Sequence, residues 1–270
     1  MISSVMFISA GVLSLLATWL ILLCIRADGT KDVIQRNISL LVSASMLCTL
    51  IGILELGFIA STGLVLTLTT VAGFTTFLVQ NLYLIGMWKH GVRGLGLLLL
   101  PLTAIPLLLL PFLPATSATP WVESYSFLET GHLFLSVLAY AMLTMAALYA
   151  VMQLLLDRAL TQKRIGFFMQ AMPSLMDISN YLFVHVRWAI WLLGLSIVTG
   201  LAWQWVEMHH FALFNHKVLL AMFAWVTLMT LYYLRQKSAW HHNRGSKMVL
   251  FAYATLMLAY FGVKIIQGLR

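Results

Sequence analysis

Charged side chains are scarce in this sequence. Only 9% of its 270 residues are Asp, Glu, Lys or Arg, whereas 61% are hydrophobic and the mean hydropathy is +0.95. Soluble domains carry about 25% charged residues. The composition therefore excludes an ordinary soluble domain and predicts a protein that resides in a membrane.

Cysteine is also rare: the sequence contains only Cys24 and Cys48, and these two do not form a CxxC motif. Thiol–disulfide exchange and a cysteine zinc ribbon are therefore not expected. No CxxCH motif occurs, so the chain is not itself a c-type cytochrome. Glycine-rich nucleotide loops, an HExxH zinc motif and a nucleophile elbow are missing as well, which argues against the common nucleotide-binding and hydrolytic enzymes.

Long apolar runs, in contrast, are abundant. Eight of them are long enough, at about 20 residues, to cross a bilayer as helices. The first lacks a basic leader and a small-residue cleavage site, so we expect a span rather than a signal peptide. We predict an all-α fold, a polytopic membrane bundle of about eight transmembrane helices forming one domain over residues 1–270. The expected spans are 4–25, 38–58, 64–87, 94–113, 131–155, 181–203, 217–234 and 248–267.

The basic residues, which give a net charge of +8, lie mostly in the connections between apolar runs. By the positive-inside rule, the connections richest in Lys and Arg face the cytoplasm, so we predict that both termini face outward. This distribution reflects topology, and no nucleic acid is expected as a partner. Thirteen of the 16 basic residues belong to the predicted inner side: Arg26, Lys31, Arg36, Lys89, Arg93, Arg158, Lys163, Arg164, Arg187, Arg235, Lys237, Arg244 and Lys247.

A polar stripe opens the fifth apolar run. Ser136 and Tyr140 follow His132 at i+4 and i+8, so the three side chains share one face of a helix. Polar side chains in a membrane span point into the protein rather than to lipid. They could form a binding site, or they could serve only helix–helix hydrogen bonding.

A second group of candidate residues lies in WQWVEMHHFALFNHK, residues 203–217, which we interpret as an aromatic ledge at the outer membrane surface. His216 opens the next span at the same predicted depth as His132. Two imidazoles from different helices could be the axial ligands of a haem iron, with Trp203 and Trp205 beside the porphyrin. Three alternatives remain open: a headgroup-facing cap at His216, an ordinary belt of interfacial tryptophans, and a zinc site that combines His216 with His209 and His210.

Four segments of the second half carry a family resemblance: GHLFLSVLAYAMLTMAALYAVMQ, AMPSLM, NHKVLLAMFAWV and LAYFGVKIIQG. They resemble the CcsA-like cytochrome c assembly proteins, in particular the YpjD-like branch, with the HemX-like proteins as near relatives. The resemblance is strongest over residues 131–270.

The resemblance implies a multi-pass protein of the bacterial inner membrane that handles haem. Larger members hold haem at the outer face with two histidines that flank a WWD motif, and His132 and His216 match these histidines. No true WWD motif occurs in this sequence, and Trp203 and Trp205 only echo it. The implied cofactor is non-covalent haem b, and the implied partners are membrane lipid and cytochrome c maturation proteins or apocytochrome c. We expect an accessory protein rather than a stand-alone catalyst. A HemX-like regulator or scaffold without haem transfer is the main alternative, and a transporter is weaker because the spans lack paired internal charges.

Overall fold

The computed structural model describes residues 2–27, 31–56, 59–60, 63–90, 94–112, 122–124, 127–163, 172–208, 216–237 and 242–259. These residues form two compact units. Unit 1 comprises Met1–Tyr125 with Lys163–Pro173, and unit 2 comprises Ser126–Gln162 with Ser174–Arg270. The expectation that residues 1–270 form one domain stays a prediction.

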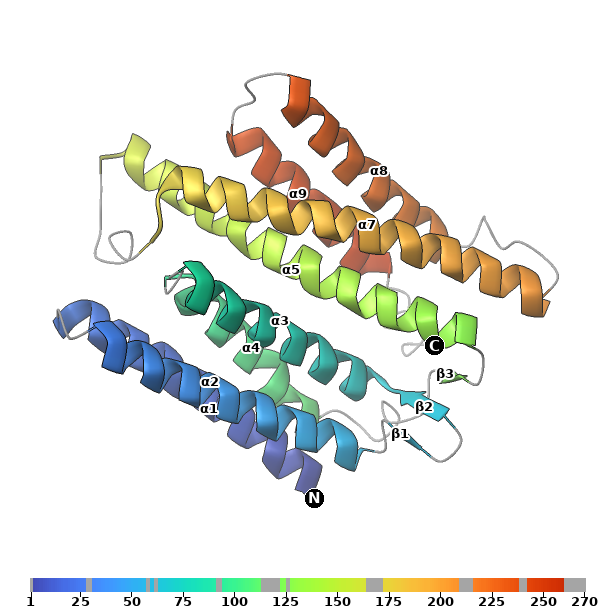
Figure 1. Cartoon of the computed structure of the whole chain (residues 1–270), viewed down its shortest axis with the longest axis horizontal. Coiled ribbons are helices and arrows are strands. Elements are labelled where there is room, and N and C mark those ends of the chain that lie inside the picture. Colours follow the sequence, from blue (N-terminus) through green and yellow to red (C-terminus); the bar gives the residue numbers. More distant parts are fainter. Residues whose placement is uncertain are drawn as a thin grey trace. The chain divides into compact units, whose positions relative to one another are not determined.

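Unit 1 contains four helices that run alongside one another (Figure 1). They are α1 (Ile2–Ala27), α2 (Lys31–Glu55), α3 (Leu68–His90) and α4 (Gly96–Leu109), which continues as the 3-10 turn η1 (Leu110–Phe112). Helix α1 packs against α2 and α4, and α3 packs against the same two helices. Pro101 and Pro106 lie inside α4.

A cluster of hydrogen bonds joins all four helices of unit 1. The amide nitrogen of Gln80 on α3 donates to Ser14 Oγ of α1 over 2.9 Å and to Thr103 Oγ1 of α4 over 3.3 Å. Ser45 Oγ of α2 lies 2.9 Å from Ser14 Oγ. All four side chains are buried. Interhelical hydrogen bonds of this kind help membrane helices to associate, because lipid tails offer polar groups no partner.

Unit 1 also contains a small antiparallel sheet that the sequence did not predict. Its strands are β1 (Ile59–Ala60), β2 (Gly63–Leu66) and β3 (Val122–Ser124), in the order β1-β2-β3. The predicted third span, 64–87, is therefore wrong at its start, because residues 64–66 are in β2. The start of α3 is set by Thr67 and Thr70: each backbone N–H donates to the other residue's hydroxyl, over 2.8 and 3.1 Å. Hydropathy cannot detect this boundary, since Leu64 to Leu66 are as apolar as a span.

In its described residues, unit 2 likewise contains four helices that run alongside one another (Figure 1). They are α5 (Phe127–Thr161), α7 (Leu175–Met208), α8 (His216–Lys237) and α9 (His242–Met257). Helix α5 packs against α7 and α9, and α8 packs against the same two helices. Ser174 caps α7, because its hydroxyl accepts from Asp177 N over 3.2 Å and donates to Asp177 Oδ2 over 2.6 Å.

The helices confirm a polytopic membrane fold. Each of the eight predicted spans corresponds to a helix, and six helices in the described parts of the chain are long and apolar enough to cross a membrane: Ile2–Ile25, Gln35–Glu55, Thr69–Lys89, Phe127–Thr161, Leu175–Val206 and Lys217–Gln236. The fourth span appears as the shorter apolar helix Gly96–Phe112. The eighth corresponds to α9, and its predicted end lies outside the described residues. The outward orientation of both termini stays a prediction.

Candidate functional site

His132 lies near the N-terminus of α5 and is held against α7. Its Nδ1 lies 2.7 Å from the backbone oxygen of Ser196. A carbonyl oxygen only accepts hydrogen bonds, so Nδ1 carries the proton and donates it. In the neutral imidazole, Nε2 then keeps its lone pair, which is the form that binds metal ions.

Two serine hydroxyls extend this contact between α5 and α7. Ser136 Oγ donates to the backbone oxygen of His132 over 2.7 Å and lies 2.7 Å from Ser196 Oγ. Ser196 Oγ is in turn 3.4 Å from His132 Nδ1. The structure therefore brings His132 and Ser136 together, as their i+4 spacing predicts, and adds Ser196.

Gly200 provides the surface on which the His132 ring rests. A Cβ atom placed on Gly200 would lie 2.8 Å from both Cε1 and Nδ1 of His132, closer than real side chains approach. Neither Ser196 nor Gly200 stands out in the sequence by residue type. Together with Trp203 they follow an i, i+4, i+7 pattern, which marks one face of α7 and could have identified them.

Trp203 and Trp205 lie in the last turns of α7, which continues to Met208. The predicted ledge is therefore wrong in its first part, where the span was expected to end at residue 203. Trp203 is half-buried, and its indole Nε1 is buried with no hydrogen-bond partner in the described part of the chain. Trp205 is 54% exposed. Residues two apart on a helix do not share a face, so the two rings point in different directions.

His216 is the first residue of α8. Helix α8 begins at the end of unit 2 where α5 begins and α7 ends (Figure 1). The side chain of His216 lies outside the described residues, as do His209 and His210, so the pairing of His132 with His216 stays a prediction. Among the residues that the structure describes, no three His, Cys, Asp or Glu side chains are grouped to hold a metal ion.

Tyr140 departs from the predicted polar stripe. Its hydroxyl donates to the backbone oxygen of Leu256 on α9 over 3.0 Å. Ser136 thus contacts α7, whereas Tyr140 contacts α9, although both share a helix face with His132. The structure assigns Tyr140 a helix–helix hydrogen bond, and its role in cofactor binding stays a prediction.

Comparisons with known proteins agree with the predicted family. The family model described as cytochrome c assembly protein matches residues 2–270, well beyond the half in which we expected the resemblance to be strongest. The inner membrane protein YpjD of Escherichia coli strain K12 is 35% identical over 186 residues, which cover 66% of this chain and 67% of that protein. An uncharacterized 28.8 kDa protein of Azospirillum brasilense, in a nifR3-like 5' region, is 32% identical over 136 residues, half of each chain. No solved structure matches.

The family match covers almost the entire chain, and the relative from Escherichia coli is by name an inner membrane protein. Six helices in the described residues can cross a membrane. The chain therefore belongs to the cytochrome c assembly protein family and is a multi-pass protein of the bacterial inner membrane.

Proposed function

We propose that this protein binds haem b non-covalently at the end of unit 2 where α5 begins and α7 ends, and presents it at the outer face of the membrane in support of cytochrome c assembly. The observation that carries the proposal is the 2.7 Å hydrogen bond from His132 Nδ1 to the Ser196 backbone oxygen. Histidines that bind metal ions almost always donate their second ring nitrogen in this way, which fixes the tautomer and the ring orientation.

The surrounding residues fit a haem. His132 would offer Nε2 to the iron, and Gly200 leaves room for the imidazole against α7. The buried indole N–H of Trp203 can donate to an acceptor such as a haem propionate, since buried donors are almost always paired. His216 would provide the second axial ligand. Bound haem supplies an iron whose redox potential its axial ligands set.

Visible absorption spectra of the detergent-purified protein, oxidised and dithionite-reduced, test this proposal. We expect a Soret band and sharp reduced bands in the wild type, and loss of bound haem by more than about tenfold in His132→Ala and in His216→Ala. Even outer-shell partners of a metal ligand change affinity by about 10–100-fold.

His185→Ala is the matched control for these substitutions. His185 is also on unit 2 and also has its Nδ1 2.8 Å from a backbone oxygen, that of Tyr181, but it lies toward the other end of α7. We expect its spectrum to match the wild type. A wild type that stays colourless after haem is added, or equal haem loss in all three variants, would overturn the proposal.

A regulatory or scaffolding role without haem transfer is the second candidate. The observation that favours it is a pocket of about 430 Å³ near the end of α5 and the start of α9, whose lining residues are mostly polar or charged and include Asp157, Arg158 and Lys247. A partner protein could dock there. This role predicts that Arg158→Gln with Lys247→Gln impairs cytochrome c assembly or haem synthesis in cells while the haem spectrum of the purified protein is unchanged.

A further inference from the structure

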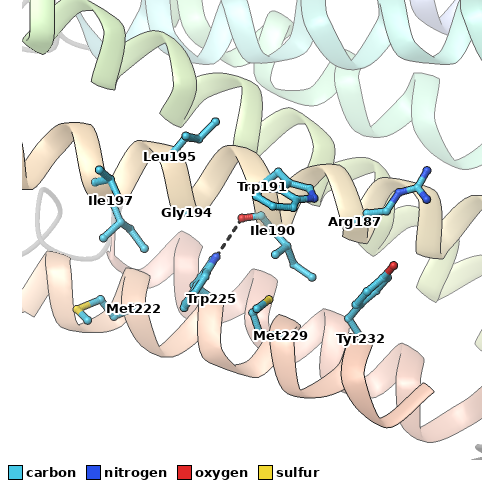
Figure 2. A pocket seen from close by; sticks show the side chains of 11 residues that line it. Arg187, Ile190, Trp191, Gly194, Leu195, Ile197, Met222, Trp225, Met229 and Tyr232 are labelled. Carbon is cyan, nitrogen blue, oxygen red and sulfur yellow. Dashed lines mark hydrogen bonds between the residues drawn. The ribbon is translucent and has the colours of Figure 1, made fainter. Parts of the chain in front are cut away.

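A groove of about 560 Å³ follows the contact between α7 and α8 in unit 2 (Figure 2). Its lining is almost entirely aliphatic, thioether or aromatic, and Trp191 and Val198 along it are 66% and 63% exposed. Arg187 and Tyr232 lie at one end of the groove, and Met222 and Ile197 lie at the other (Figure 2). The groove is thus apolar along its length and polar at one end.

Trp225 of α8 lines the groove and contacts α7 (Figure 2). Its indole N–H donates to the backbone oxygen of Ile190 over 3.0 Å. Its ring nitrogen also lies 3.0 Å from where a Cβ on Gly194 would stand, so it rests directly on α7. An indole has no hydrogen-bonding group besides this N–H. The part of Trp225 that lines the middle of the groove is therefore apolar.

Arg187 is the only charged residue among the described residues that line the groove. It is exposed, on the side of the membrane that the positive-inside rule predicts to be cytoplasmic. That leaflet carries anionic lipids, which attract basic side chains near the surface. An arginine guanidinium is well suited to bind a phosphate group.

The length of the groove matches one leaflet of a bilayer. From Arg187 to Val198 it follows α7 for about 16 Å, at a rise of 1.5 Å per residue. Half of a hydrocarbon core of about 30 Å is about 15 Å.

The geometry points to a binding site for one anionic phospholipid, with its phosphate at Arg187 and one acyl chain in the groove between α7 and α8. The bound lipid joins α8 to α7, which carries Ser196 and Gly200. Haem is the less suitable occupant, because no imidazole or thiolate occurs among the described residues of the lining. This site is separate from the proposed haem ligands.

Native mass spectrometry of the full-length protein, released from detergent after incubation with phosphatidylglycerol or phosphatidylcholine, tests the assignment. We expect the wild type to retain a single phosphatidylglycerol in preference to phosphatidylcholine. Arg187→Gln should reduce this preference about fivefold, the factor that corresponds to ~1 kcal/mol per basic residue near an anionic surface. Val198→Trp should prevent retention of both lipids by narrowing the groove.

Two matched controls separate the groove from general surface effects. Arg244→Gln removes an exposed basic residue of α9, and Val184→Trp enlarges an exposed valine of α7; neither residue lines the groove, so both variants should retain lipid as the wild type does.

His132→Ala should also retain lipid, which distinguishes failure of this proposal from failure of the haem proposal. Retention that Arg187→Gln and Val198→Trp leave unchanged would overturn the lipid site. Added haem that displaces the lipid and is itself lost in Val198→Trp would assign the groove to haem instead.

Discussion

At the scale of single residues, His132 can occupy its position because Gly200 has no Cβ atom. The imidazole occupies the space where any other side chain would begin, and the Ser196 carbonyl fixes its orientation. Gly131, the neighbour of His132 on α5, provides the opposite case, because a Cβ there would meet no atom within 4 Å. Substitution of Gly200 should therefore displace the His132 ring, whereas substitution of Gly131 should not.

Gly200→Ala should move the His132 ring out of place and weaken haem binding by about 10–100-fold, the range seen when the outer-shell support of a metal ligand is changed. Haem titration followed by absorbance at the Soret maximum measures this effect.

Gly131→Ala is the control for that titration. It should leave the haem affinity unchanged and stabilise α5 by up to about 1 kcal/mol, since alanine is the better helix former. If both alanine variants bind haem as tightly as the wild type, the contact between His132 and Gly200 does not support the site.

At the scale of elements, polar side chains decide where helices begin and how they pair. Thr67 with Thr70 starts α3, and Ser174 with Asp177 starts α7. Both pairs have the i, i+3 spacing of a helix cap. A search of the sequence for capping residues can identify them, whereas a hydropathy scan cannot. The predicted spans differ from the helices mainly at such ends, because a hydropathy window averages over them.

The helices of unit 1 should depend measurably on Gln80. Gln80→Leu keeps the volume of the side chain but removes the hydrogen bonds to Ser14 and Thr103. We expect the free energy of unfolding to fall by about 1 kcal/mol, within the range measured for hydrogen bonds between membrane helices. Unfolding by SDS in mixed micelles, followed by far-ultraviolet circular dichroism, measures the change.

Gln236→Leu is the matched control, since Gln236 is exposed near the end of α8. It should unfold at the same SDS fraction as the wild type. Equal stabilities for the wild type and Gln80→Leu would show that the hydrogen-bond cluster contributes no net stability.

At the scale of the whole molecule, the distribution of basic residues predicts which ends of the helices face the cytoplasm. Lys217 follows His216 at the predicted outer surface, and Arg244 lies near the start of α9 at the predicted inner surface. Both are exposed. The proposed haem site requires His132 and His216 to face outward, whereas the proposed lipid site requires Arg187 to face inward. A single topology must satisfy both.

Cysteine labelling tests this topology. In a chain whose Cys24 and Cys48 are replaced by serine, a membrane-impermeant maleimide should label Lys217→Cys in intact cells. It should label Arg244→Cys only after the inner membrane is permeabilised. The reverse pattern would contradict the outward orientation of both termini and would place His132 on the cytoplasmic side.

The sequence by itself determined the membrane class, the number and approximate extent of the helices in the described residues, and the family. These properties depend on apolar runs and local motifs, which can be identified along the sequence without knowing which helices pack together. His132 and Ser136 were predictable for the same reason, since i+4 spacing alone places them on one face. Only the tertiary structure decided that Ser196 and Gly200 support His132, that Tyr140 binds α9, and that an apolar groove ends at Arg187. These contacts depend on which helices pack together and at what height, and interhelical packing is not encoded in the periodicity of any one helix.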